Sequence, residues 1–182
     1  LAVRGLVDLA GAWPRIAPGD TATASRWTTR ATALRERLVA SVRASVRHDL
    51  EPPYVPPLSG VKRTFREALA AEHPSEQQWP HRAYAELLQA DVLPDDLAHL
   101  VIDAMRGHGA TSLGVVANIG PVDPKSRDIL GFISYGYAQQ LLRLDRVDEY
   151  LLFLYAPRHH APTPGSWTSL ASARSPTRRA PT

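Results

Sequence analysis

Cysteine is absent from the 182-residue sequence, so neither a disulfide framework nor a thiolate metal site can form. Long apolar runs are also missing, and we therefore expect no membrane span. The first residues lack the charged region followed by an apolar stretch that is typical of a signal peptide. From these absences we expect a cytoplasmic protein. We also predict that it has no metal site and no cofactor.

Lysine is scarce as well, because only Lys62 and Lys125 accompany the 19 arginines among the 21 basic residues. Four of these arginines lie beyond residue 157, where the sequence has no acidic residue. The preceding part of the chain therefore carries 17 basic and 18 acidic side chains, a net charge of −1. A nucleic-acid-binding domain concentrates basic side chains on its folded surface, so we expect no nucleic-acid partner.

Helical periodicity dominates the first two thirds of the sequence. The longest amphipathic pattern covers residues 25–50, with apolar residues at every third or fourth position: Trp27, Ala31, Leu34, Leu38, Val42 and Val46. We interpret the arginines on its other sides as a solvated face. Shorter helices are predicted over 61–73, 81–93 and 94–109. The last of them has an apolar stripe that should face inward: Leu97, Leu100, Val101, Ala104 and Met105.

Prolines and glycines predict a loop over 11–20 and an extended linker over 51–60, which contains four prolines. Residues 2–9 alternate loosely and are interpreted as a short strand. Enrichment in Val, Ile, Phe and Tyr predicts three further strands, 112–120, 128–136 and 149–157. The expected fold is therefore α/β (α+β): a mixed sheet of about three to four strands with one long amphipathic helix and several shorter helices.

Residues 1–157 are expected to form a single α/β domain. The following stretch, 158–182, is rich in Arg, Ser and Pro and has no apolar periodicity, so we expect it to be disordered. His159 and His160 could ligate a metal, but no further ligand follows them, and we interpret them as a flexible pair. His99 and Asp103 are spaced to meet on one helix face, where a solvated surface pair is expected.

Three motifs carry a resemblance to a known family. The first is "LVDLAGAWPRIAPGD" (6–20). The second is the pattern A-x-x-L-x-x-x-L in the predicted long helix, at Ala31, Leu34 and Leu38. The third, "VVANIGPVDPKSRDILGF", contains Asn118-Ile119-Gly120 before a polar loop. In this order the motifs resemble the C-terminal lobe of the condensation-like acyltransferases, which are related in fold to chloramphenicol acetyltransferase.

The resemblance implies an enzyme fragment that moves an acyl group from a thioester, on coenzyme A or a carrier protein, to a small-molecule hydroxyl or amine acceptor. It places Asn118 and Gly120 on the side of the substrate tunnel. The family's catalytic motif, His-His-x-x-x-Asp-Gly, has no counterpart here, because His159-His160 is followed by Ala-Pro-Thr. The implied lobe therefore contains no catalytic residue and should be inactive alone. The initial Leu1 agrees with a fragment or with an unusual start codon.

Two other interpretations remain open. The chain could be a non-catalytic small α/β protein whose helices bind a partner. Alternatively, the chain could come from an open reading frame whose tail has no function, and the same could hold for more of its sequence. An upstream extension that encodes the missing histidine motif would favour the acyltransferase fragment. The sequence identifies neither the acyl donor nor the acceptor.

Overall fold

The computed structural model describes residues 1–58, 60–64, 67, 74–119, 127–129 and 131–160. Six α-helices lie within these residues: α1 (Ala2–Ile16), α2 (Thr21–Ser45), α4 (Pro74–Gln89), α5 (Asp95–Gly107), α6 (Tyr135–Arg143) and α7 (Val147–His160). Three short strands, β1 (Thr111–Ser112), β2 (Val115–Ile119) and β3 (Arg127–Ile129), accompany a 3₁₀ turn, η1 (Gly131–Ser134). The described chain is mainly helical, so the predicted α/β class with a mixed sheet is wrong. The predicted disordered segment lies outside the described residues from 161 onward.

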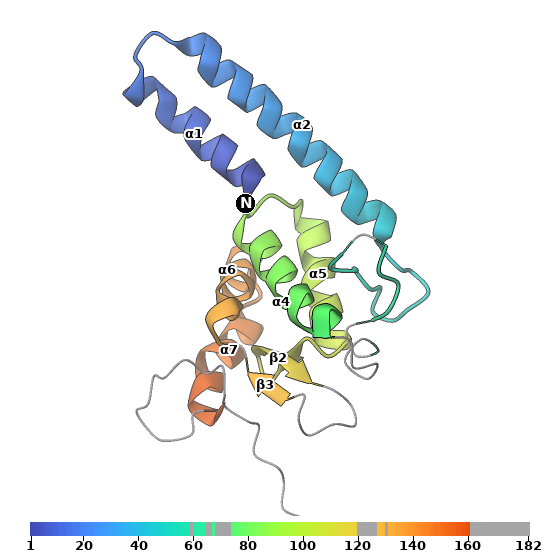
Figure 1. Ribbon diagram of the computed structural model, residues 1–182. Coiled ribbons are helices and arrows are strands. Elements are labelled where there is room, and N and C mark those ends of the chain that lie inside the picture. The colour runs from blue at the N-terminus through green and yellow to red at the C-terminus, as the bar shows by residue number, and fades with distance from the viewer. Residues whose placement is uncertain (59, 65–66, 68–73, 120–126, 130, 161–182) are drawn as a thin grey trace, which may run out of the picture.

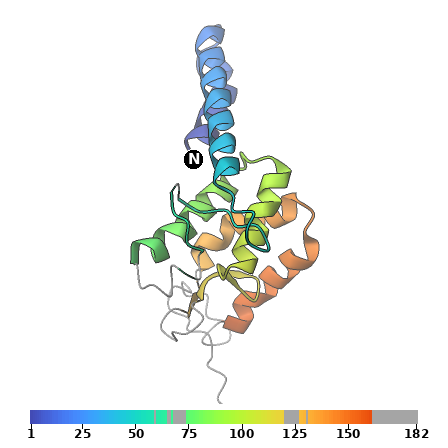
Figure 2. The same cartoon turned by 90° about the vertical axis from the view of Figure 1, so that its right-hand side faces the viewer.

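Helices α1 and α2 form a hairpin that projects from the rest of the protein, and we call this hairpin the arm (Figures 1 and 2). The predicted strand over 2–9 and the loop over 11–20 are wrong up to Ile16, because α1 occupies them. The helix packs against α2, and its less exposed apolar residues recur at helical spacing: Val3, Leu6, Ala10 and Trp13. The local pattern fits a strand or a helix, and the packing of α1 against α2 stabilises the helix.

The long helix predicted over 25–50 is confirmed as α2, which ends at Ser45. Its N-cap is Asp20, whose carboxylate accepts a hydrogen bond from the backbone N–H of Thr23 at 3.1 Å. Near the same end of the arm, the rings of Trp13 and Trp27 meet edge to face with centroids 4.4 Å apart. The capped end and the aromatic contact join the two helices at the free end of the arm.

The base of the arm is anchored to the body, which we define as residues 46–157. Val3 of α1 is buried with Ala90 and Val92, and Leu34 and Leu38 of α2 pack against this small cluster. Two polar contacts reinforce the junction. Arg35 donates to the Val92 carbonyl at 2.7 Å, and Arg43 forms an ion pair with Asp96 at 2.7 Å.

The main core lies among α4, α5 and α6. The predicted inward stripe of α5 is confirmed, since four of its residues are buried and Leu100 packs against the core cluster. Helices α4 and α6 cross closely at Gly136. The predicted linker over 51–60 contributes buried side chains, because Tyr54 and Val55 are each 1% exposed and Tyr54 forms an isolated β-bridge with Arg47.

Other predicted boundaries also change. The helix predicted over 81–93 is found as α4, which begins earlier and runs continuously through Trp79-Pro80. Most of the predicted helix 61–73 lies outside the described residues. The predicted strand 149–157 is wrong, because α7 occupies it. Its first turn contains Asp148 and Glu149, and its leucines favour helix. None of the described helices is both long and apolar enough to cross a membrane.

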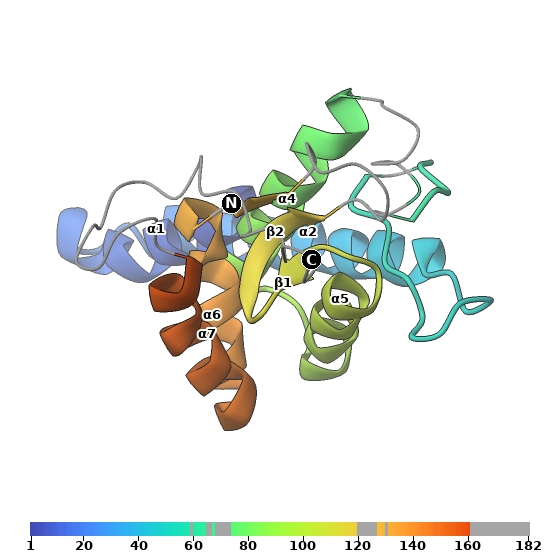
Figure 3. The same ribbon diagram turned by 90° about the horizontal axis from the view of Figure 1, so that it is seen from below.

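The three strands form one short antiparallel sheet in the order β1-β2-β3. The segment predicted as a strand over 112–120 is thus extended along β2, whereas 128–136 is extended only at its start and then becomes η1 and α6. Figure 3 shows β1 and β2 between α5 and the pair α6–α7. In the expected α/β fold the long helix over 25–50 would cover one face of this sheet. Instead, α7 packs against it, because Val115 and Ala117 of β2 are buried together with Ala156 of α7.

Candidate functional site

The two residues that the family resemblance places in a substrate tunnel are not brought into a common site by the described structure. Asn118 lies in β2 opposite Asp128 of β3. Gly120 lies outside the described residues. The groove described next is lined by neither of them. The assignment of Asn118 and Gly120 to substrate binding therefore stays a prediction.

An open groove of about 590 Å³ lies between α5, α7 and the β1–β2 turn. Its lining combines charged, aromatic and apolar residues: Pro52, Asp103, Arg106, Gly107, Thr111, Leu113, Gly114, Tyr137, Glu149 and Leu152. The turn approaches α7 so closely that a Cβ at Gly114 would lie 2.8 Å from the backbone nitrogen of Phe153. Gly114 also has φ of +86°, so glycine is required there on two grounds.

Ion pairs occupy the charged side of this groove. Arg146, whose side chain is 13% exposed, bonds Asp103 at 2.6 Å and Glu149 through a second guanidinium–carboxylate contact. Arg106 also pairs with Glu149. The described ion-pair partner of Asp103 is thus Arg146 and not the His99 considered from sequence. These contacts join α5 to the start of α7, and each of the two carboxylates is paired with at least one arginine.

Tyr137 is the most deeply buried polar group at the groove. Its side chain is 1% exposed, and burial raises the pKa of its hydroxyl, with smaller opposing contributions from Arg106 and Arg146. Its hydroxyl has no hydrogen-bond partner among the described residues. The described lining contains no histidine, and both of its carboxylates are paired with arginines.

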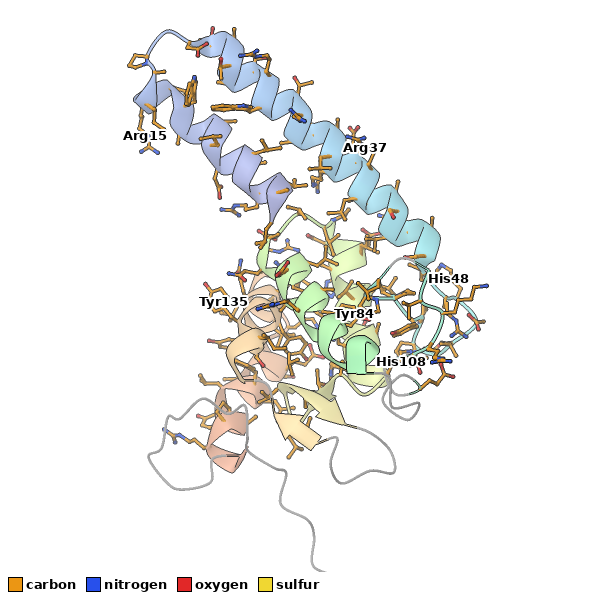
Figure 4. The ribbon with its side chains drawn as sticks, viewed as in Figure 1. Arg15, Arg37, His48, Tyr84, His108 and Tyr135 are labelled. Carbon is orange, nitrogen blue, oxygen red and sulfur yellow. The ribbon has the colours of Figure 1, made fainter. Side chains whose placement is uncertain are left out.

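The arm presents a second kind of surface. Arg26, Arg30 and Arg37 lie on one side of α2, within an arc of about 40° at 100° per residue and along about 16 Å of the helix. All three are exposed, and none forms an ion pair with an acidic residue in the described part of the chain. Figure 4 shows Arg37 on the side of α2 that faces away from α1. We call these three residues the arginine stripe.

The two remaining arginines within α2 behave differently, because Arg35 and Arg43 are used to anchor the arm. In the stripe, Arg26 only donates to the Thr23 hydroxyl at 2.9 Å, and Arg37 to the carbonyl of Ala33 at 3.3 Å. Both contacts are local, and neither arginine forms an ion pair with a described carboxylate, although the charge of Arg26 acts on Asp20 as a minor contribution to lowering the pKa of that residue. The stripe is therefore available to negatively charged groups of another molecule.

Charge is segregated between the arm and the body. Residues 1–45 carry seven arginines and three acidic residues, a net charge of +4. The body, residues 46–157, carries 10 basic and 15 acidic residues, a net charge of −5. Sequence reasoning missed this division because the two parts almost cancel when they are summed. A count over a sliding window of about 40 residues would have found it.

The arm also exposes apolar surface. On α1, Val7 is 50% exposed, Leu9 38% and Ile16 62%. The residues of the α1–α2 seam are themselves only half-buried: Leu6, Ala10, Trp13, Trp27, Leu34 and Leu38. Two helices alone do not enclose such a seam. The arm thus combines an apolar surface with a row of unpaired arginines.

Comparison with known proteins gives no family for this chain, since no protein-family model, curated protein or solved structure matches it. The residues that the structure describes contain no group of three or more His, Asp or Glu side chains that could hold a metal ion. Function therefore has to be argued from the surfaces of the protein, of which the arm carries the clearest chemical character.

Proposed function

We propose that the chain is a non-catalytic helical interaction protein whose arm binds negatively charged groups on a partner protein. The observation that carries this proposal is the arginine stripe along one side of α2. Three exposed guanidinium groups that form no ion pair with a described residue lie along one helix face, on an element that projects from an acidic body. Arginine suits this role because its planar group bonds a carboxylate through two parallel N–H donors.

The arrangement of the arm supports an interaction role in a second way. The partner is held away from the body of net charge −5, which would repel it. Exposed apolar residues on α1, such as Val7 and Ile16, supply the surface whose burial adds to the affinity. Specific interfaces combine an apolar centre with a polar rim, and the arm offers both components.

The acyltransferase interpretation stays a prediction. It rests on the motifs around Asn118 and on the missing histidine motif being supplied by a segment upstream. The mainly helical architecture of the described residues removes the mixed sheet that the resemblance implies. The interaction proposal needs no upstream segment, and we prefer it for that reason.

The test uses immobilised poly-L-glutamate as a probe for protein-like carboxylates. In the arm variant, Arg26, Arg30 and Arg37 are replaced by glutamine, which preserves helix propensity. Three exposed ion pairs at about 0.5 kcal/mol each predict affinity about tenfold lower at low salt. The difference should vanish at high salt, where exposed charges are screened.

The matched control replaces Arg174, Arg178 and Arg179 by glutamine and so removes the same charge from the end of the sequence. It should retain the affinity of the unaltered chain to within about twofold, equivalent to about 0.4 kcal/mol. Equal losses in both variants would show that net charge, and not the arginine stripe, governs binding, and would refute the proposal.

A further inference from the structure

The turn between α6 and α7 carries the opposite character to the arm. Two exposed acidic residues, Asp145 and Asp148, lie there beside three exposed apolar side chains. These are Leu142 (52% exposed), Val147 (47%) and Leu151 (44%). We call these five residues the acidic corner. Asp145 has φ of +57°, a left-handed conformation at the tight turn that joins the two helices.

The two carboxylates of the acidic corner are free of counter-charges within the described structure. Neither Asp145 nor Asp148 forms an ion pair with a described residue. Their neighbours differ, because Asp91, Asp95 and Glu149 all bond arginines that lie on or next to α6 and α7. Arg143 and Arg146 already form ion pairs with those three carboxylates, so the charges of Asp145 and Asp148 are not neutralised and the acidic corner is negative.

We propose that the arm of one molecule docks on the acidic corner of a second copy of this chain. The inference rests on the interaction function proposed above and names its partner. Charge complementarity favours this occupant, because one chain carries an arm of net charge +4 and a body of net charge −5. In a dimer, each copy can offer both surfaces, so two equivalent contacts close a twofold assembly.

The composition of the two surfaces also matches. The arm has the arginine stripe together with exposed Val7 and Ile16, and the corner has two aspartates together with exposed Leu142 and Val147. A nucleic acid would satisfy the arginines but would meet the apolar residues of α1 with a charged backbone. A second copy satisfies the charged and the apolar parts together.

The experiment is a charge swap followed by sedimentation velocity at low salt. In the arm-reversed variant, Arg26, Arg30 and Arg37 are replaced by glutamate. In the corner-reversed variant, Asp148 is replaced by arginine and Asp145 by asparagine, which tolerates the left-handed turn. The unaltered chain should self-associate, and each variant alone should self-associate at least about tenfold more weakly because like charges then face each other.

Mixing the two variants provides the decisive measurement. The glutamates of one variant then meet the arginine corner of the other, and the unaltered arm of the second meets the unaltered corner of the first. We expect heterodimers in the mixture, even though each variant alone is monomeric. Thermal unfolding of each variant must show that it is folded, and the corner-reversed variant should still bind poly-L-glutamate through its intact stripe.

Two results would overturn the inference. One is an unaltered chain that stays monomeric at concentrations where the arm binds poly-L-glutamate, in which case the proposed function survives and only the partner is wrong. The other is a dimer that neither variant weakens. If the arm variant and the control variant instead lost affinity for poly-L-glutamate equally, the proposed function itself would be refuted. The failure of the dimer and the failure of the proposed function are therefore distinguishable.

Discussion

Replacing Gly136 by alanine tests the closest helix crossing in the body. Gly136 lies in the first turn of α6, directly against α4. An added Cβ would lie 2.4 Å from the carbonyl oxygen of Ala85 and 2.8 Å from the backbone nitrogen of Gln89. Both are main-chain atoms, which cannot rotate away as a flexible side chain does. The two helices must therefore separate to accommodate the methyl group.

The expected cost follows from that geometry. A carbon and an oxygen in contact need more than 3 Å, so α6 has to shift by close to an ångström against α4. Overpacking of a well-filled core costs about 1–3 kcal/mol, and we expect the upper end because two backbone groups resist together. Alanine favours helix over glycine by up to about 1 kcal/mol, which offsets part of the loss. A net destabilisation of about 2 kcal/mol corresponds to a Tm lower by about 4–8 °C.

Gly11→Ala in α1 is the matched control. A Cβ there meets nothing within 4 Å, and the residue is exposed within a helix. The same substitution should therefore raise the free energy of unfolding by about 0.5–1 kcal/mol. Denaturant and thermal unfolding of both variants, followed by circular dichroism, give the comparison. A Gly136 variant as stable as the Gly11 variant would refute the close crossing of α4 and α6.

Two further substitutions test buried and exposed hydrogen bonds. Gln140→Leu should lower the free energy of unfolding by about 1–3 kcal/mol, because it removes the hydrogen bonds that the buried Gln140 amide donates to the Leu88 carbonyl at 2.8 Å and to the Asp91 carboxylate at 3.0 Å. In the arm, hydrogen bonds from Thr23 and Trp13 lower the pKa of Asp20 below its ordinary value of 3.8. The charged form is thus favoured by folding, so its contribution is complete above pH 3.8 and is lost as the pH falls through the lowered pKa. Asp20→Asn keeps a capping oxygen but does not titrate, and tryptophan fluorescence during acid titration should show a smaller acid-induced loss of arm structure in that variant.

The parts of the fold that the sequence predicts well are those with a complete local signal. Helix α5 has an apolar stripe along its whole length, two aspartates in its first turn and a glycine after its end, and all of these are found in the structure. Helix α2 is predicted for the same reason. The strand β2 is also found, because Val115 and Val116 favour an extended chain that is buried.

The parts that are wrong depend on contacts between distant segments. The loose alternation over 2–9 fits a strand as well as a helix, and the packing of α1 on α2 decides between them. Helix α7 is apolar on its outer side too, at Leu151, Leu154 and Tyr155, so its sequence has no helical period to detect. The prolines of 51–60 suggest a linker, yet Tyr54 reaches the core from between them.

The arginine stripe could not be predicted from the sequence, because it too depends on contacts between distant segments. Periodicity identifies the arginines of the long helix as an outer face, but it does not show which of them find partners. The structure separates anchoring residues, such as Arg35 and Arg43, from the arginine stripe, because only the folded chain brings the Val92 carbonyl and Asp96 to the base of the arm. The acidic corner likewise emerges only once the arginines around α6 have been assigned to other carboxylates.

The construction of the arm explains why an interaction role fits this fold. A hairpin of two helices encloses little surface, and the buried residues of α1 and α2 are only Val3, which packs against Ala90 and Val92 of the body, and Ala31. The Trp13–Trp27 contact stabilises the free end but leaves both rings half-exposed. A docked partner would therefore bury more apolar surface on the hairpin than on the body, because the body already encloses its own core. The unpaired arginines lie on this same incompletely buried element, so the segment with most to gain from association also carries the charge that selects a partner.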